Sequence, residues 1–145
     1  MDGTRIQIDE YVKTYTKSHP NTEVIVGCDS QNRKVTTSYA VVVAMYEPGH
    51  GAHVVFSKMR SPKEKVRSVR LLNEVYYSIE TAEQLRNAGI DNLKCIDIDI
   101  NPNPKYKSNE VFAQAKGMVE GMGYEVRYKT LCPLVTTMAD TLARY

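Results

Sequence analysis

Aspartate and isoleucine alternate along the run Cys95-Ile96-Asp97-Ile98-Asp99-Ile100, and this pattern constrains the fold more than any other part of the chain. A strand places every second side chain on the same face, so Asp97 and Asp99 share one face and the isoleucines share the other. Aspartate is rare in strands, and two carboxylates on one face of a buried strand repel each other unless a cation or basic group intervenes. The alternative is an edge strand whose aspartate face is exposed to water.

Three further acids stand in three different local contexts. Asp29 ends the apolar run of residues 24–28, Glu74 lies inside a helical stretch over residues 68–85, and Asp140 lies in a final helical stretch over residues 133–145. Taken singly, Asp29 could be a turn-initiating residue, and Glu74 and Asp140 could be solvated helix residues. Taken together, carboxylates from separate elements suggest a shared divalent cation, Mg²⁺ or Mn²⁺, because such hard cations take oxygen ligands. Two such ions support phosphodiester cleavage.

The rest of the pattern predicts an α/β fold. The expected elements are, in order, a helix near 6–15, strands at 23–28, 38–46 and 52–59, a long helix, a strand at 93–100, a helix at 108–121, a strand at 124–129 and the final helix. We expect the long helix to begin at Ser61-Pro62 and to end at Gly89, because proline suits a first helical turn and glycine a helix end. A three-strand meander followed by strand–helix alternation predicts a mixed sheet with helices packed on its faces.

The bulk composition fits one globular domain over residues 1–145. Hydrophobic residues make up 42% of the chain and charged residues 25%, which is ordinary for such a domain. The apolar runs are far shorter than a membrane span, and the N-terminus does not have the pattern of a signal peptide. The three cysteines are isolated in sequence, so neither a zinc site nor a disulfide framework is expected. These features predict a cytoplasmic protein with reduced thiols.

Two local groups of basic residues indicate where a nucleic acid would bind. The net charge is only +2, so any attraction must come from such local groups. The larger group is opposed only by Glu64 and consists of Lys58, Arg60, Lys63, Lys65, Arg67 and Arg70. The smaller group is Lys105 and Lys107. Phosphate contacts of this kind are the sequence-independent part of nucleic-acid binding, and the alternative is a solvated helix start.

The order of acids along the predicted elements resembles that of the ribonuclease H-like superfamily. The resemblance covers nearly the whole chain, and Asp140-Thr141-Leu142-Ala143 looks like the Asp-x-Leu-Ala segment of that superfamily's last helix. Within the superfamily, the chain is similar to small bacterial and phage proteins of the YkuK type. The segments that carry this similarity are Gly27-Cys28-Asp29-Ser30-Gln31, Glu74-Val75-Tyr76-Tyr77-Ser78, residues 99–109 with their Asp-Ile-Asn-Pro-Asn-Pro start, and Met138-Ala139-Asp140.

The resemblance implies both a fold and a set of metal ligands. The fold would be a ribonuclease H-like mixed five-stranded sheet in the order 3-2-1-4-5, with helices on both faces. Asp29 would bridge two metal ions, and Glu74, Asp99 and Asp140 would be further catalytic ligands. Asp97 is an additional acid without a clear counterpart in ribonuclease H, and we include it among the candidate metal ligands.

The chain also departs from true ribonuclease H. Ser30-Gln31 follows Asp29 in place of a Gly-Ser pair, and no histidine stands between the fifth strand and the last helix. The resemblance therefore implies the fold more strongly than it implies cleavage of RNA–DNA hybrids.

The leading hypothesis is a metal-dependent nuclease that hydrolyses RNA or DNA by a two-metal mechanism. The residues expected to contact the nucleic acid are Ser30, Gln31, Asn101, Lys63, Lys65, Arg67, Lys105 and Lys107. One alternative is a non-catalytic module on the same fold that binds nucleic acid or a nucleotide. Another is an interaction protein for which the fold is only a scaffold.

Overall fold

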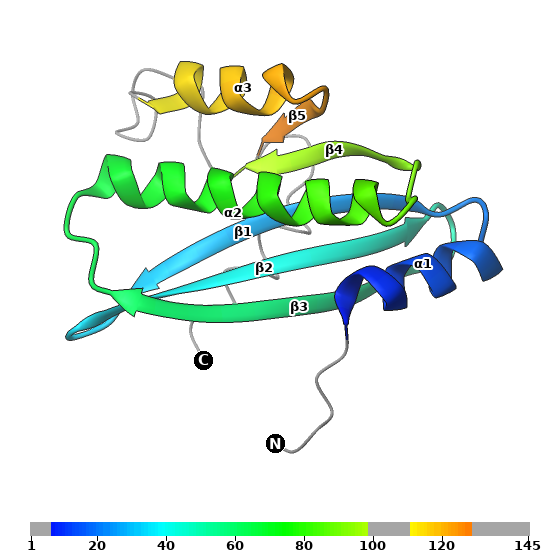
Figure 1. Ribbon diagram of the computed structural model, residues 1–145, viewed down its shortest axis with the longest axis horizontal. Coiled ribbons are helices and arrows are strands. Elements are labelled where there is room, and N and C mark those ends of the chain that lie inside the picture. Colours follow the sequence, from blue (N-terminus) through cyan, green and yellow to red (C-terminus); the bar gives the residue numbers. More distant parts are fainter. Residues whose placement is uncertain (1–6, 99–110, 129–145) are drawn as a thin grey trace.

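The computed structural model describes residues 7–98 and 111–128, which form a five-stranded sheet and three helices (Figure 1). The elements are α1 (Ile8–Ser18), β1 (Glu23–Asn32), β2 (Thr36–Glu47), β3 (Gly51–Pro62), α2 (Arg67–Asn87), β4 (Leu93–Ile98), α3 (Phe112–Gly121) and β5 (Glu125–Tyr128). The strands lie in the order β3-β2-β1-β4-β5. This mixed sheet confirms the order expected from the sequence.

The first strand lies at the centre of the sheet, where the two halves of the topology meet. β1 pairs antiparallel with β2, and β2 pairs antiparallel with β3, which gives the predicted meander. On its other side β1 pairs parallel with β4, which in turn pairs parallel with β5. Two rows of paired residues cross the sheet near the candidate acids: Asp29–Ala40–Lys58, and Phe56–Val42–Gly27–Asp97–Arg127.

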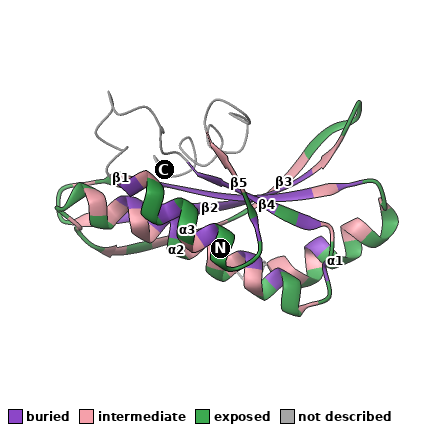
Figure 2. Ribbon diagram, turned by 90° about the horizontal axis from the view of Figure 1, so that it is seen from above, coloured by how far each residue is buried: buried purple, intermediate pink, exposed green. Residues whose placement is uncertain are grey.

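The three described helices lie on one side of the sheet (Figure 2). Side chains of this helix face form the main core, with Val26, Val41, Leu85, Ile96 and Val119 among its buried members. The opposite face carries a smaller buried cluster of Ile25, Val42 and Ala44. We call these the helix face and the acid face, because Asp29 and Asp97 alternate with core residues along their strands. The predicted final helix, over residues 133–145, lies outside the described residues.

The first strand and the long helix differ from the sequence expectation at their ends. β1 does not stop before Ser30 but continues to Asn32, because its backbone pairs with β2 throughout, up to the match of Asn32 with Thr37. Ser30 and Gln31 are therefore strand residues and not part of a turn, and Asp29 lies within the strand.

Pro62 ends β3 and does not begin the helix, so the prediction of a helix start at Ser61-Pro62 is wrong. The backbone after Pro62 is held against the β1–β2 hairpin: Lys63 N–H donates to the Val35 carbonyl over 3.1 Å, and Glu64 N–H donates to Thr37 Oγ1 over 2.9 Å. α2 begins only at Arg67, once this extended segment has passed the hairpin.

The C-terminal end of α2 is the one predicted from Gly89. This residue has φ +97°, and its N–H donates to the Arg86 carbonyl, while Ile90 N–H donates to the Leu85 carbonyl over 3.2 Å. The buried side chains of Ile90 and Leu85 belong to the same core cluster. These contacts form a Schellman end, in which glycine is favoured because other residues are strained at positive φ.

Replacing Gly89 with alanine should destabilise the protein by about 1–2 kcal/mol, the cost of placing a Cβ in the left-handed region. The matched control is Gly117→Ala inside α3, where φ is not positive and no atom lies within 4 Å of the added Cβ. That change should stabilise the protein by up to about 1 kcal/mol, because alanine favours a helix. Urea denaturation measures both, and equal effects of the two changes would contradict this account of the helix end.

Candidate functional site

Asp29 and Ser30 are consecutive residues of β1, so their side chains leave the strand on opposite faces of the sheet. Asp29 is 7% exposed and faces away from the helices, on the acid face. Ser30 is 3% exposed and faces α2, as the core residue Cys28 does two positions earlier. The interpretation of Asp29 as a turn-initiating residue is wrong, because it is a buried residue paired with Ala40 of β2.

Glu74 lies on the buried side of α2 and is bonded to the residue that follows Asp29. Its carboxylate is 4% exposed and accepts a hydrogen bond from Ser30 Oγ. Arg70, one helical turn earlier, donates from Nη1 to Ser30 Oγ over 3.4 Å. Glu74 is therefore not a solvated helix residue. A buried carboxylate is tolerated here because a hydroxyl donates to it and a guanidinium lies close by.

The two carboxylates act electrostatically on the same thiol. Burial raises the pKa of Cys28 well above its ordinary value, and the negative charges of Glu74 and Asp29 raise it further. Cys28 is next to Asp29 in the chain and shares the helix face with Ser30. Glu74 and Asp29 thus add to the effect of burial on this thiol, Glu74 from the helix face and Asp29 from the next residue of β1.

Asp97 is fully buried in β4 and is not part of an edge strand. Its exposed fraction is 0%, and β4 lies between β1 and β5. The edge-strand alternative is therefore wrong. Asp97 stands opposite Gly27 on one side and Arg127 on the other, so an arginine arises from the neighbouring strand on the same face. Arg127 also forms an ion pair with Glu23 over 2.5 Å, which links β5 to the start of β1.

Part of the predicted ligand set lies outside the described residues. These positions are Asp99, Asp140, Asn101, Lys105 and Lys107. Within residues 7–98 and 111–128, no three histidine, cysteine, aspartate or glutamate side chains form a group that could hold a metal ion. The donors that are described are carboxylate oxygens, which is the chemistry that Mg²⁺ and Mn²⁺ require. The convergence of Asp29 and Glu74 with Asp99 stays a prediction.

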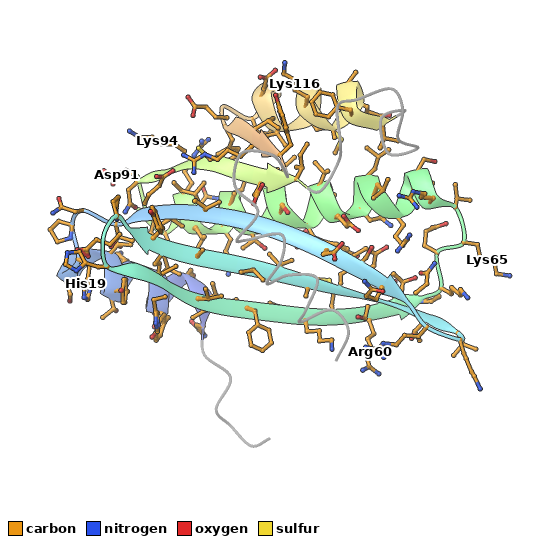
Figure 3. All side chains as sticks on the ribbon, turned by 180° about the vertical axis from the view of Figure 1, so that it is seen from behind. His19, Arg60, Lys65, Asp91, Lys94 and Lys116 are labelled. Atoms are coloured by element: carbon orange, nitrogen blue, oxygen red, sulfur yellow. The ribbon has the colours of Figure 1, made fainter. Side chains whose placement is uncertain are left out.

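The larger basic group extends from β3 through the segment that leads into α2. Lys63, Lys65 and Arg67 are exposed, and Lys65 and Arg60 lie toward the same end of the molecule (Figure 3). Arg70 is half-buried and reaches Ser30, as described above. The interpretation as a solvated helix start is thus wrong for Lys63 and Lys65, because they precede α2. Gln31 is half-buried and pairs with Ser38 on the acid face.

Sequence reasoning missed the contribution of Arg33 to this basic surface. Burial lowers the pKa of Lys58, and the positive charges of Arg33 and of Arg60, two residues along β3, lower it further. Arg33 comes from the β1–β2 turn, and its N–H donates to the Thr36 carbonyl over 2.8 Å. Only the pairing register of the hairpin brings Arg33 toward β3, and a residue-by-residue count of basic side chains does not contain that information.

A sequence model of the family described as Ribonuclease H-like matches residues 5–144 of the chain. The protein belongs to the ribonuclease H-like family. Among curated proteins, the comparison found no match. The ribonuclease H-like match includes β1, α2 and β4 together with the positions of Asp99 and Asp140. None of the helices in the described part of the chain is long and apolar enough to cross a membrane.

Removal of the Ser30 hydroxyl should take one hydrogen bond away from the buried Glu74 carboxylate. We expect Ser30→Ala to destabilise this ribonuclease H-like protein by about 1–3 kcal/mol, the cost of removing one hydrogen bond from a buried charged group. The control is Ser18→Ala at the exposed end of α1, which should change stability by less than about 0.5 kcal/mol. If thermal denaturation shows the two variants to be equally stable, Ser30 does not hold Glu74 in place.

The two described thiols predict a loss of stability at alkaline pH. The ordinary cysteine pKa is 9.0, burial raises that of Cys28 well above this value, and burial raises that of Cys95 to about 11. Above pH 9 the unfolded thiols release their protons while the folded ones keep them, so the free energy of unfolding falls as pH rises. Below pH 9 the two thiols have no such effect.

Urea denaturation at pH 8 and pH 10 tests this prediction. The wild-type protein should lose stability between the two values, and Cys28→Ala should lose less, because one of the two thiols is gone. An equal loss in both proteins would show that the folded Cys28 ionises as readily as the unfolded one.

Proposed function

We propose that the 145 residues form a single ribonuclease H-like domain that acts as a metal-dependent nuclease and hydrolyses phosphodiester bonds of RNA or DNA. The supporting facts are membership of the ribonuclease H-like family and the burial of Asp29 and Glu74 around the middle strand of the sheet. We assign Mg²⁺ or Mn²⁺ as the cofactor and the cytoplasm as the location.

The observation that carries the proposal is the hydrogen bond from Ser30 to the buried Glu74 carboxylate. It fixes an acid of α2 beside the strand residue that follows Asp29. A buried glutamate that serves only the fold is costly, whereas a carboxylate held in place is what an ion site requires. Asp29 from the acid face and Glu74 from the helix face would hold the ion at the edge of β1, beyond its last described pair with β4, Gly27 with Asp97. Ser30 would orient Glu74.

The pairing of β1 with β4 suggests how the remaining ligands join. Gly27 stands opposite Asp97 in the parallel register, and two residues further along the two sequences stand Asp29 and Asp99. We therefore assign Asp99 as the ligand supplied by the fourth strand, Asp140 as a further ligand, and Asp97 as the deeper member of the acidic set. When bound, Mg²⁺ or Mn²⁺ would activate a water molecule and stabilise the leaving oxygen.

Basic and polar side chains would position the nucleic acid relative to these acids. Lys63, Lys65 and Arg67 are exposed just before and at the start of the helix that carries Glu74, so their charges would attract the phosphate backbone. The other assigned contacts are Gln31, Asn101, Lys105 and Lys107. Contacts of this kind set the register of the strand but do not read its bases.

The variant Asp29→Asn should lose cleavage by more than about 10²-fold while it stays folded. The amide keeps the shape of the side chain but removes the negative charge that holds the cation, and the ion contributes several kcal/mol to the transition state. The assay follows labelled single strands, duplexes, hybrids and junctions with Mg²⁺ or Mn²⁺.

The matched control is Asp91→Asn, because Asp91 is exposed and lies far from Arg60 and Lys65 (Figure 3). It should cleave as the wild type does. Binding of these substrates without cleavage by the wild type, with either metal, would replace the nuclease by a non-catalytic nucleic-acid binding module. Cleavage that survives in Asp29→Asn would contradict the assigned role of Asp29.

A further inference from the structure

The outer strand β3 presents an aromatic ring and two cations on the acid face of the sheet. Phe56, Lys58 and Arg60 occupy alternate positions, and their β2 partners are Val42, Ala40 and Ser38. The intervening residues Val55 and Met59 pack on the opposite side, against the main core. Alternation therefore places the three side chains in a line on the acid face, about 7 Å apart from one to the next.

Phe56 is the apolar member of this line. Half of its side chain, 50%, is exposed, although its partner Val42 is fully buried. A half-exposed aromatic side chain offers a flat apolar face to a ligand. Its flat ring on the surface of a sheet, next to positive charge, is the arrangement that proteins use to stack bases of single-stranded nucleic acid.

The charges beside Phe56 are concentrated and positive. Arg60 is two residues from Lys58 on the same face of β3, and Arg33 N–H donates to the carbonyl of Thr36, whose partner on β3 is Pro62. The positive charges of Arg33 and Arg60 lower the pKa of Lys58, after burial. Arg60 lies at the lower edge of the sheet in the view of Figure 3, on the side that this picture shows facing the reader. Three positive charges grouped on one side of an outer strand are complementary to a polyanion.

The line leads toward the candidate acids. Ala40 of β2 pairs with Asp29 of β1 on one side and with Lys58 of β3 on the other. Asp29 and Lys58 are therefore two strand spacings, about 10 Å, apart across the sheet. Phe56 belongs to the neighbouring row, which ends at Asp97 and Arg127. A strand held by β3 would therefore pass beside the carboxylates of β1.

We propose that Phe56, Lys58, Arg60 and Arg33 form a binding surface for single-stranded nucleic acid, in which Phe56 stacks on a base and the three cations contact phosphates. The inference deepens the proposed nuclease function by naming its substrate class. It rests on that function only for the path of the bound nucleic acid from β3 toward the acids of β1. In a duplex the bases are already stacked and paired, so their faces are closed to Phe56. The surface thus selects single strands over duplexes.

Binding measured without a divalent metal tests the surface separately from cleavage. Fluorescence anisotropy in EDTA would compare a labelled 15-nucleotide poly-dT strand, the corresponding poly-U strand and a duplex of the same length. The wild type should bind the single strands more tightly than the duplex. Phe56→Leu should weaken single-strand binding about tenfold, and Phe56→Tyr should retain it, because leucine keeps the apolar bulk and tyrosine also keeps the ring.

The cations are tested by the salt dependence of binding. The double variant Lys58→Gln and Arg60→Gln should weaken binding and reduce the slope of log K against log salt by about 0.7 for each lost phosphate contact. Lys116→Gln is the control, since Lys116 is exposed on α3, on the helix face (Figure 3). It should bind as the wild type does.

The outcomes separate this inference from the nuclease proposal. Binding that depends on Phe56, without cleavage under any metal, would support the surface and remove the nuclease. If the wild type cleaves, and Phe56→Leu and the double variant bind and cleave as the wild type does, the nuclease proposal stands and the inferred binding surface is wrong. Tighter binding of the duplex than of the single strands would also overturn the surface.

Discussion

The hydrogen bond between Ser30 and Glu74 is the contact on which the rest of the candidate site depends. It joins the middle strand of the sheet to the helix that packs over it, and it does so with a carboxylate that is 4% exposed. A buried charge of this kind costs several kcal/mol unless partners offset the loss of hydration. The fold thus keeps a costly buried carboxylate, Glu74, beside the middle strand of its sheet. Arg70 donates a hydrogen bond to Ser30, which donates to Glu74.

The site is divided between the two faces of one strand. Ser30 and Glu74 lie on the helix face, while Asp29 and Asp97 lie on the acid face, so an ion shared by Asp29 and Glu74 would lie at the edge of β1 beyond its last described pair with β4. The extension of β1 to Asn32 makes this division possible. Only in a continuous strand do the side chains of Asp29 and Ser30 point to opposite faces of the sheet. The basic surface of β3 then continues the acid face outward from Asp29. Strand alternation alone therefore assigns each charged residue of the meander to a side.

Periodicity and turn residues predicted the parts of the fold that local rules decide. The meander, the helix end at Gly89 and the placement of Asp97 opposite the isoleucines follow from alternation and from glycine geometry, and the structure confirms each of them. The strand order came from the resemblance to the ribonuclease H-like superfamily, which the family match bears out.

The end of β1 and the start of α2, which the sequence predicted wrongly, depend on interactions between residues distant in sequence. The contacts that hold the site do so as well. Pro62 suits a first helical turn locally, yet bonds to Val35 and Thr37 keep the following residues extended. Glu74 is buried on the same side of α2 as Leu71 and Ser78, and its hydrogen bond comes from Ser30, which is distant in sequence. The approach of Arg33 to Lys58 likewise needs the hairpin register. Sequence patterns record which residues are charged, and tertiary pairing determines which of them meet.

The central claim, that these acids hold a divalent cation, is tested most directly by thermal denaturation with and without millimolar Mn²⁺. An ion that binds only the folded state stabilises it by about 2.7 kcal/mol at a hundredfold excess over Kd. If the acids hold the ion, the Tm of the wild type and of Asp91→Asn should rise by several degrees, and the Tm of Asp29→Asn and of Glu74→Gln should not change. A wild-type Tm that Mn²⁺ leaves unchanged, or an equal rise in all four proteins, would contradict this claim.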